Sequence, residues 1–167
     1  MIIETSRAGF CYRLEHFAAN GERLHRLRSQ NLMPEVGMNY VVGAAFGGQS
    51  PASAWYIGLF SGGYTPYPPD TMASFPLNAQ EFTQYAGNTR VPFTPRPPEA
   101  GGIDNAANRA EFVFTGDGEI KGGFIASSSG KGATSGILVS AVRFSSPILV
   151  HPEETLRVLA GFALVST

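Results

Sequence analysis

The sequence predicts a single mostly-β domain, a β-sandwich or jelly-roll-like fold with one short α-helix and long loops rich in proline and glycine. Three observations lead to this prediction. Short segments of alternating or continuously apolar residues recur along the chain, as they do in strands. In the last third, turn residues separate these segments at intervals of roughly 8–12 residues, which is typical of sandwiches and barrels. The length of 167 residues suits one domain, and no repeat or change of composition marks a second one within 1–167.

The N-terminal segment 9–30 is predicted to form a β-hairpin. Side chains on one side of residues 9–17 are mainly apolar: Phe10, Tyr12, Leu14 and His16. The opposite side carries Cys11, Arg13, Glu15 and Phe17. Asn20-Gly21 is a strong hairpin turn signal, so residues 22–30 return as the partner strand.

The returning strand presents a basic outer face, and His16 and His25 could face each other across the hairpin. The residues of this face are Arg23, His25, Arg26 and Arg28. The pattern fits a solvated surface and a contact surface equally well.

Residues 34–46 are predicted to form the single helix. Pro34 suits the first turn and Glu35 suits the positive end of the helix dipole, while Gly47-Gly48 supplies a stop. Gly37 and Gly43 weaken a helix, but they also permit close packing against a sheet.

The apolar run 55–60 predicts a buried strand, and a long irregular region follows over 61–102. Short helical turns are expected near 70–73 and 77–81, and an extended piece near 90–93. Aromatic residues on these proline-fixed loops are either anchors for a protein partner or side chains that pack back onto their own sheet.

The C-terminal region 110–165 is predicted to be β again. Strands are expected at 110–115, 119–126, 137–144 and 156–165, with Pro147 and Pro152 in the last connection. Gly122-Gly123 suggests a bulge or a close backbone approach, and 127–136 is a polar segment expected to be flexible. The final strand is apolar on both faces, which predicts a central position.

Charge and composition favour a surface that contacts other proteins. Only 15% of residues are charged, against a typical value of about 25%, and the chain has 20 Gly and 12 Pro. Such a surface is either covered by neighbouring subunits or simply poor in charge. Ten of the 12 basic residues are Arg, which is favoured over Lys at protein interfaces, although a GC-rich genome would produce the same bias.

The same data argue against several classes of partner. The net charge of −1 predicts neither a nucleic acid nor a membrane as partner. No apolar run reaches the roughly 18 residues of a membrane span, and the start lacks the pattern of a secretory signal, so we expect synthesis in a cytoplasm. Cys11 is the one cysteine and is expected to be a buried structural thiol.

No pattern of catalytic or metal-binding residues is recognisable, so we predict a protein that is not an enzyme and has no cofactor. His16, His25 and His151 have no partner at metal-ligand spacing. Residues 130–134 resemble a phosphate-binding loop only faintly, and a nucleophile elbow is missing.

Several stretches together resemble small virion proteins of tailed bacteriophages, in particular capsid cement (decoration) proteins. They begin with the opening hairpin and the segment 31–40, and continue with the run 55–60 before Tyr64-Thr65-Pro66. The remaining stretches are 109–114, 121–124 and 127–132.

The resemblance implies a virion structural protein on the capsid exterior that binds and stabilises neighbouring major capsid subunits, as a dimer or higher oligomer. Partner-binding anchors are then expected among the aromatic loops, with the basic hairpin strand as second choice: Tyr64, Tyr67, Phe75, Tyr85 and Arg90, then Arg23, Arg26 and Arg28. The alternatives are a phage neck, tail or fibre component and a carbohydrate-binding β-sandwich module that would use Trp55 or an exposed tyrosine.

Overall fold

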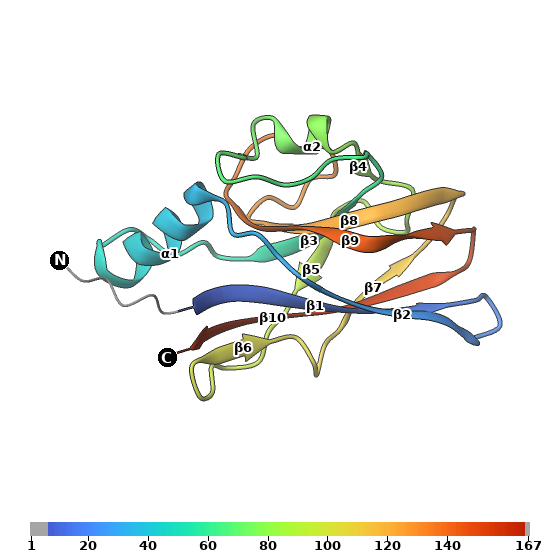
Figure 1. Cartoon of the computed structure of the whole chain (residues 1–167), viewed down its shortest axis with the longest axis horizontal. Coiled ribbons are helices and arrows are strands. Elements are labelled where there is room, and N and C mark those ends of the chain that lie inside the picture. Colours follow the sequence, from blue (N-terminus) through green and yellow to red (C-terminus); the bar gives the residue numbers. More distant parts are fainter. Residues whose placement is uncertain (1–6, 166–167) are drawn as a thin grey trace.

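The computed structural model describes residues 7–165 of the chain. Within this range, ten strands form two antiparallel five-stranded sheets, which lie as two layers in Figure 1. Helix α1 (Glu35–Phe46) lies at one end of the sandwich, and α2 (Phe75–Asn78) lies above the second sheet. The predicted β-sandwich is therefore confirmed.

The first sheet is built around the two terminal strands of the chain. Its members are β1 (Arg7–Phe17), β2 (Arg23–Gln30), β6 (Gly102–Asp104), β7 (Ala110–Val113) and β10 (Thr155–Val165). The order is β2-β1-β10, and β6 and β7 both pair with the far edge of β10. The final strand is thus central, as its two apolar faces predicted, and the opening hairpin is present with the predicted turn.

The second sheet is built around the apolar run 55–60. Its members are β3 (Trp55–Phe60), β4 (Glu81–Phe82), β5 (Val91–Phe93), β8 (Gly118–Ala126) and β9 (Leu138–Val150). The order is β4-β3-β8-β9, and β5 pairs with the same edge of β3 as β4 does.

The main core lies between the sheets and is formed by the inward side chains of both. Tyr12, Leu14 and Phe112 of the first sheet meet Ile57 and Ile125 of the second, and all five are buried. Burying one such side chain contributes roughly 1.5–3 kcal/mol. The Tyr12 hydroxyl shares a 2.6 Å hydrogen bond with the Ser140 hydroxyl, and burial raises the pKa of Tyr12.

A second core covers the outer face of the second sheet. Phe60 and Phe124 of the sheet pack with Met72 and Phe75 of the long region between β3 and β4. Figure 1 shows this region, including α2, lying over β3 and β8. Because the second sheet is covered on both sides, β3 is apolar throughout rather than alternating.

Helix α1 has the bounds expected from its proline and glycine signals, and a glycine sets its closest approach to the second sheet. A Cβ atom on Gly37 would lie 2.8 Å from the Leu138 carbonyl oxygen and 2.8 Å from the Val139 Cα. Only a residue without a side chain can therefore occupy this position.

The main error in the expected strands concerns β9. The sequence predicted a strand end at 144 with Pro147 in a connection, whereas β9 continues to Val150. Gly122 pairs with Arg143 and Ile120 with Ile148, so four residues of β9, including Pro147, bulge opposite Lys121. A bulge needs no ladder hydrogen bond from proline, which is why the strand tolerates it. Neither helix in the described residues is long and apolar enough to cross a membrane.

Candidate functional site

The outward face of the first sheet gathers most of the arginines of the chain. Since Tyr12 and Leu14 of β1 point into the core, the alternating residues Arg13 and Glu15 point outward. The pairing of β1 with β2 and β10 carries the same face across the sheet. Six of the ten arginines lie on it: Arg13, Arg23, Arg26, Arg28, Arg109 and Arg157.

Three of these six arginines form ion pairs with two carboxylates on the same face. Arg23 and Arg109 both contact Glu15, the first at 3.4 Å between Nη1 and Oε1. Arg157 donates from Nε to Oε2 of Glu111 at 2.9 Å. Exposed ion pairs of this kind are common on protein surfaces, so these three arginines need no partner from outside the chain.

The other three arginines, Arg13, Arg26 and Arg28, have no carboxylate partner among the residues that the structure describes. Together with Leu27 they line a surface pocket of about 430 Å³, which we call the arginine groove. Arg28 donates from Nε to the Cys11 sulfur at 3.2 Å, which holds its stem against the sheet. Cys11 is half-buried, not buried as the sequence suggested.

One contact across the arginine groove brings like charges together, whereas Arg26 lies opposite Glu15. Arg13 lies directly opposite Arg28 on the neighbouring strand, and like charges in this position destabilise a sheet. Charges on β2 could be explained by protection of an edge strand against pairing with another chain. Arg13, however, lies on β1, which is paired on both sides, so edge protection does not account for it.

Three exposed guanidinium groups that form no ion pair within residues 7–165 are suited to binding an anionic surface. Guanidinium offers a planar fork that pairs bidentately with carboxylate or phosphate oxygens. The edge strand β2 and its neighbour β1 hold these groups on one sheet, so their spacing is fixed before any partner arrives.

The predicted anchors of the long loop region are mostly inside the molecule. Phe75, Tyr85 and Arg90 are buried, with exposed fractions of 0%, 3% and 0%, which corrects the expectation that they face a partner. Tyr64 is half-buried and donates from its hydroxyl to Asp70 at 2.6 Å. Burial is the main cause that raises the pKa of Tyr64, and the hydrogen bond to Asp70 raises it further. Only Tyr67 of this group is exposed.

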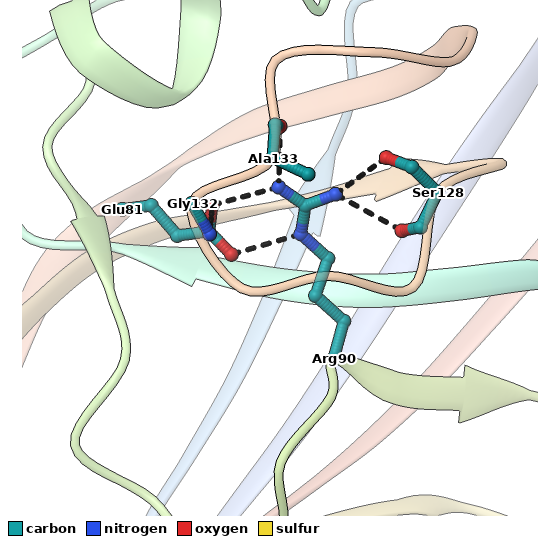
Figure 2. A network of polar contacts seen from close by, with 5 residues as sticks. All are labelled: Glu81, Arg90, Ser128, Gly132 and Ala133. Carbon is teal, nitrogen blue, oxygen red and sulfur yellow. Dashed lines mark hydrogen bonds and ion pairs between the residues drawn. The ribbon is translucent and has the colours of Figure 1, made fainter.

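Arg90 is the centre of a buried polar network, shown in Figure 2. Its guanidinium forms two parallel 2.8 Å hydrogen bonds to the carboxylate of Glu81. The remaining donors reach the carbonyl and hydroxyl oxygens of Ser128 and the Ala133 carbonyl, at 2.7–3.0 Å. Oε2 of Glu81 also accepts from the Gly132 amide at 2.9 Å. Every charge in the network therefore has partners, as burial requires.

Lys131 fixes the same segment from its other side. Its ammonium donates to the carbonyl oxygens of Thr83, Tyr85 and Gly87 at 2.6–3.1 Å and lies 3.7 Å from the centre of the Tyr85 ring. Burial lowers the pKa of Lys131, and the nearby Glu81 opposes this shift. The segment 127–136, expected to be flexible, is thus tied to the segment 81–90, and Lys131 is engaged by carbonyls rather than presented to a phosphate.

The histidines form two separate pairs with carboxylates. His16 and His25 stack at 5.7 Å across the hairpin, as their register predicted, and Nε2 of His16 lies 2.8 Å from Glu154. His151 lies 2.6 Å from Asp117, and this hydrogen bond raises the pKa of His151. No three His, Cys, Asp or Glu side chains between residues 7 and 165 are grouped as metal ligands.

Sequence reasoning selected Arg23, Arg26 and Arg28 but missed Arg13. The period-two pattern of residues 9–17 already placed Arg13 on the outward side. The pattern could not give the strand register, which sets Arg13 opposite Arg28. It also could not show that Arg23 pairs with a carboxylate while Arg26 does not.

Comparisons of the chain with protein-family models, with curated proteins and with solved structures found no match.

Proposed function

We propose that this chain is a non-enzymatic structural protein that binds neighbouring protein subunits through the arginine groove, and that its setting is the outer surface of a tailed-phage capsid. The partner is then the major capsid protein, at a place where its surface presents aspartate or glutamate side chains. The setting rests on the resemblance of the sequence to capsid cement proteins.

The observation that supports the proposal most strongly is the placement of Arg13, Arg26 and Arg28. They form an exposed cluster in which none of the three guanidinium groups makes an ion pair among the described residues, and in which Arg13 lies opposite Arg28, while Glu15 lies opposite Arg26. A partner carboxylate at each guanidinium would turn this repulsion into charge-assisted hydrogen bonds. Electrostatic complementarity of this kind also speeds association and fixes orientation.

The rest of the fold supports a contact surface that keeps its shape. The Arg90 and Lys131 networks tie the loops around β4 and β5 to the β8–β9 connection. Exposed Tyr67 remains a candidate anchor, since tyrosine contributes large contact area at low entropic cost. On a repeating shell, a dimer or higher oligomer of the chain would engage several equivalent sites, and multivalency would multiply a modest single-site affinity.

The copy number per particle tests this function. In purified particles of the phage that encodes the chain, quantitative gel densitometry against the major capsid protein should give hundreds of copies. A value in the low tens or fewer would favour the neck, tail or fibre alternative and overturn the capsid assignment. A preparation without the chain would reject a virion role altogether.

A further inference from the structure

A pocket of about 400 Å³ lies beside α1, the helix that Figure 1 shows at one end of the sandwich. Both sheets and the helix contribute to its walls. The lining residues are Phe10, Tyr40, Val41, Ala44, Ala45, Trp55, Phe93, Pro95, Ile103, Ile125, Val139 and Phe162.

The pocket exists because α1 approaches the second sheet closely at one point and presents short side chains elsewhere. Gly37 brings the start of the helix against the backbone of β9. Towards its C-terminal end the helix directs Ala44 and Ala45 at the pocket, and neither side chain is long enough to fill it. Ala45 is exposed and Ile103 of β6 is half-buried, so the pocket opens to solvent on this side.

The walls are fixed by contacts among their own aromatic rings. Phe10 and Phe162 of the first sheet pack at 5.1 Å between ring centres, and Tyr40 packs edge-on against Trp55 at 5.4 Å. The Tyr40 hydroxyl accepts a hydrogen bond from the Ala52 amide, which ties α1 to the chain entering β3. These contacts preform the pocket, and a preformed pocket lowers the entropic cost of binding.

The chemistry of the lining selects against charge. None of the lining side chains is ionisable apart from the phenol of Tyr40, and that hydroxyl is already hydrogen-bonded. Since the walls offer water few hydrogen-bond partners, an apolar molecule can displace water from the pocket at little cost. A charged group entering here would lose its hydration without compensation.

The size of the pocket selects against a polypeptide element. One turn of an α-helix with its side chains, about 10 Å across and 5.4 Å long, would need roughly the whole volume for itself. The volume lies instead at the lower end of the range of small-molecule sites, which is about 300–1,000 Å³.

We propose that this pocket binds one small, neutral, apolar molecule with at least one aromatic ring, which packs among Phe10, Trp55, Phe93 and Phe162. The proposal is independent of the capsid function, since it uses none of the residues of the arginine groove.

Titration of the full-length chain with N-phenyl-1-naphthylamine, an uncharged dye that fluoresces in apolar surroundings, tests the proposal. We expect saturable binding of one dye per chain. Ala44→Phe places a ring inside the pocket and should weaken dye binding at least about tenfold, which corresponds to the loss of roughly 1.4 kcal/mol. Val42→Phe is the matched control, because Val42 lies on the same helix but is exposed and outside the lining; it should leave the affinity within about twofold.

Ile103→Phe fills the same pocket from the opposite wall, and it provides the test if Ala44→Phe fails to fold. Dye binding that is not saturable, or that survives both filling variants, would overturn the proposal. Binding that changes with Val42→Phe and not with the filling variants would place the dye on the exposed outer side of α1, and would overturn it equally.

Discussion

At the scale of single residues, Arg90 illustrates why the buried polar network of this protein could not be predicted from the sequence. Among the described residues it is the largest fully buried side chain, and its partners are Glu81 of β4 and, in the β8–β9 connection, Ser128 and Ala133. A lone arginine beside an extended piece of chain reads as a surface residue, since arginine is almost never fully buried without a partner. Only the fold shows that Glu81 is that partner.

Replacement of Arg90 by methionine should lower the free energy of unfolding by about 3–5 kcal/mol, because the carboxylate of Glu81 would remain buried without a counter-charge. Urea denaturation followed by circular dichroism measures this. The double variant Arg90→Met/Glu81→Leu should recover a large part of the loss, since it removes both charges. Arg96→Met, at an exposed arginine, is the control and should change stability by less than about 1 kcal/mol. A single variant as stable as this control would contradict the role given to Arg90.

His151 should titrate above its ordinary pKa of 6.5, because Asp117 accepts a hydrogen bond from its protonated ring. A raised folded-state pKa means that this contact stabilises the fold fully below pH 6.5, and that its contribution is lost as the pH rises through the folded value. Proton NMR of the His151 ring measures the pKa directly. Asp117→Asn should return it towards 6.5, and an unchanged pKa in this variant would refute the assignment.

Within the first sheet, Arg13→Gln should stabilise the fold by about 0.2–1 kcal/mol, because it relieves the repulsion with Arg28 on the neighbouring strand. Arg157→Gln is the counterpart on the same face and should be neutral or destabilising, since it breaks the pair with Glu111. Thermal unfolding of the two variants compares them. Destabilisation by Arg13→Gln would mean that its guanidinium already has a partner within the chain.

At the scale of strands and helices, close approach decides where glycine is required. A Cβ atom on Gly122 of β8 would lie 2.1 Å from the Phe60 ring and 2.3 Å from the Val142 carbonyl oxygen. Gly122→Ala should therefore cost about 1–3 kcal/mol or more, measured by urea denaturation. Gly63→Ala, in a loop with open space around the added methyl, is the matched control and should be nearly neutral. Equal stability of the two variants would show that β3 and β8 can move apart.

The elements that the sequence predicted well are those set by local pattern. Alternation predicted which side chains of β1 point inward, and Pro34 and Gly47 predicted the two ends of α1. The predicted strand 55–60 has the same bounds as β3. The bulge of β9 was not predictable, because proline usually ends a strand and only the pairing partner shows that it continues.

Only part of the candidate site, the arginines of β2, could be predicted from the sequence. The basic character of β2 was evident, whereas the contrast between paired and unpaired arginines depends on register and on the positions of Glu15 and Glu111. The prediction that aromatic residues of the long loop region contact a partner was mostly wrong for a related reason. The outer face of the second sheet needs an apolar cover, and the loop that carries Phe75 supplies it.

At the scale of the whole molecule, the two faces of the sandwich differ in kind. The outer face of the second sheet is covered by the chain itself, with Met72 and Phe75 over Phe60 and Phe124. The outer face of the first sheet bears six arginines, three of which line the arginine groove. A molecule built in this way has one face suited to an acidic partner, which is the central claim of the proposed function.

Binding to emptied, expanded heads of a tailed phage, the setting that the proposed function assigns, tests this claim most directly when measured by co-sedimentation. Arg13→Gln/Arg26→Gln/Arg28→Gln should bind at least a hundredfold more weakly than the natural chain, since each close charge pair at an interface contributes about 1.5 kcal/mol or more. The variant Arg96→Gln/Lys121→Gln/Arg143→Gln loses three positive charges elsewhere and should bind within about threefold of the natural chain. Equal affinities of the two triple variants for the heads, with both proteins folded, would contradict the account.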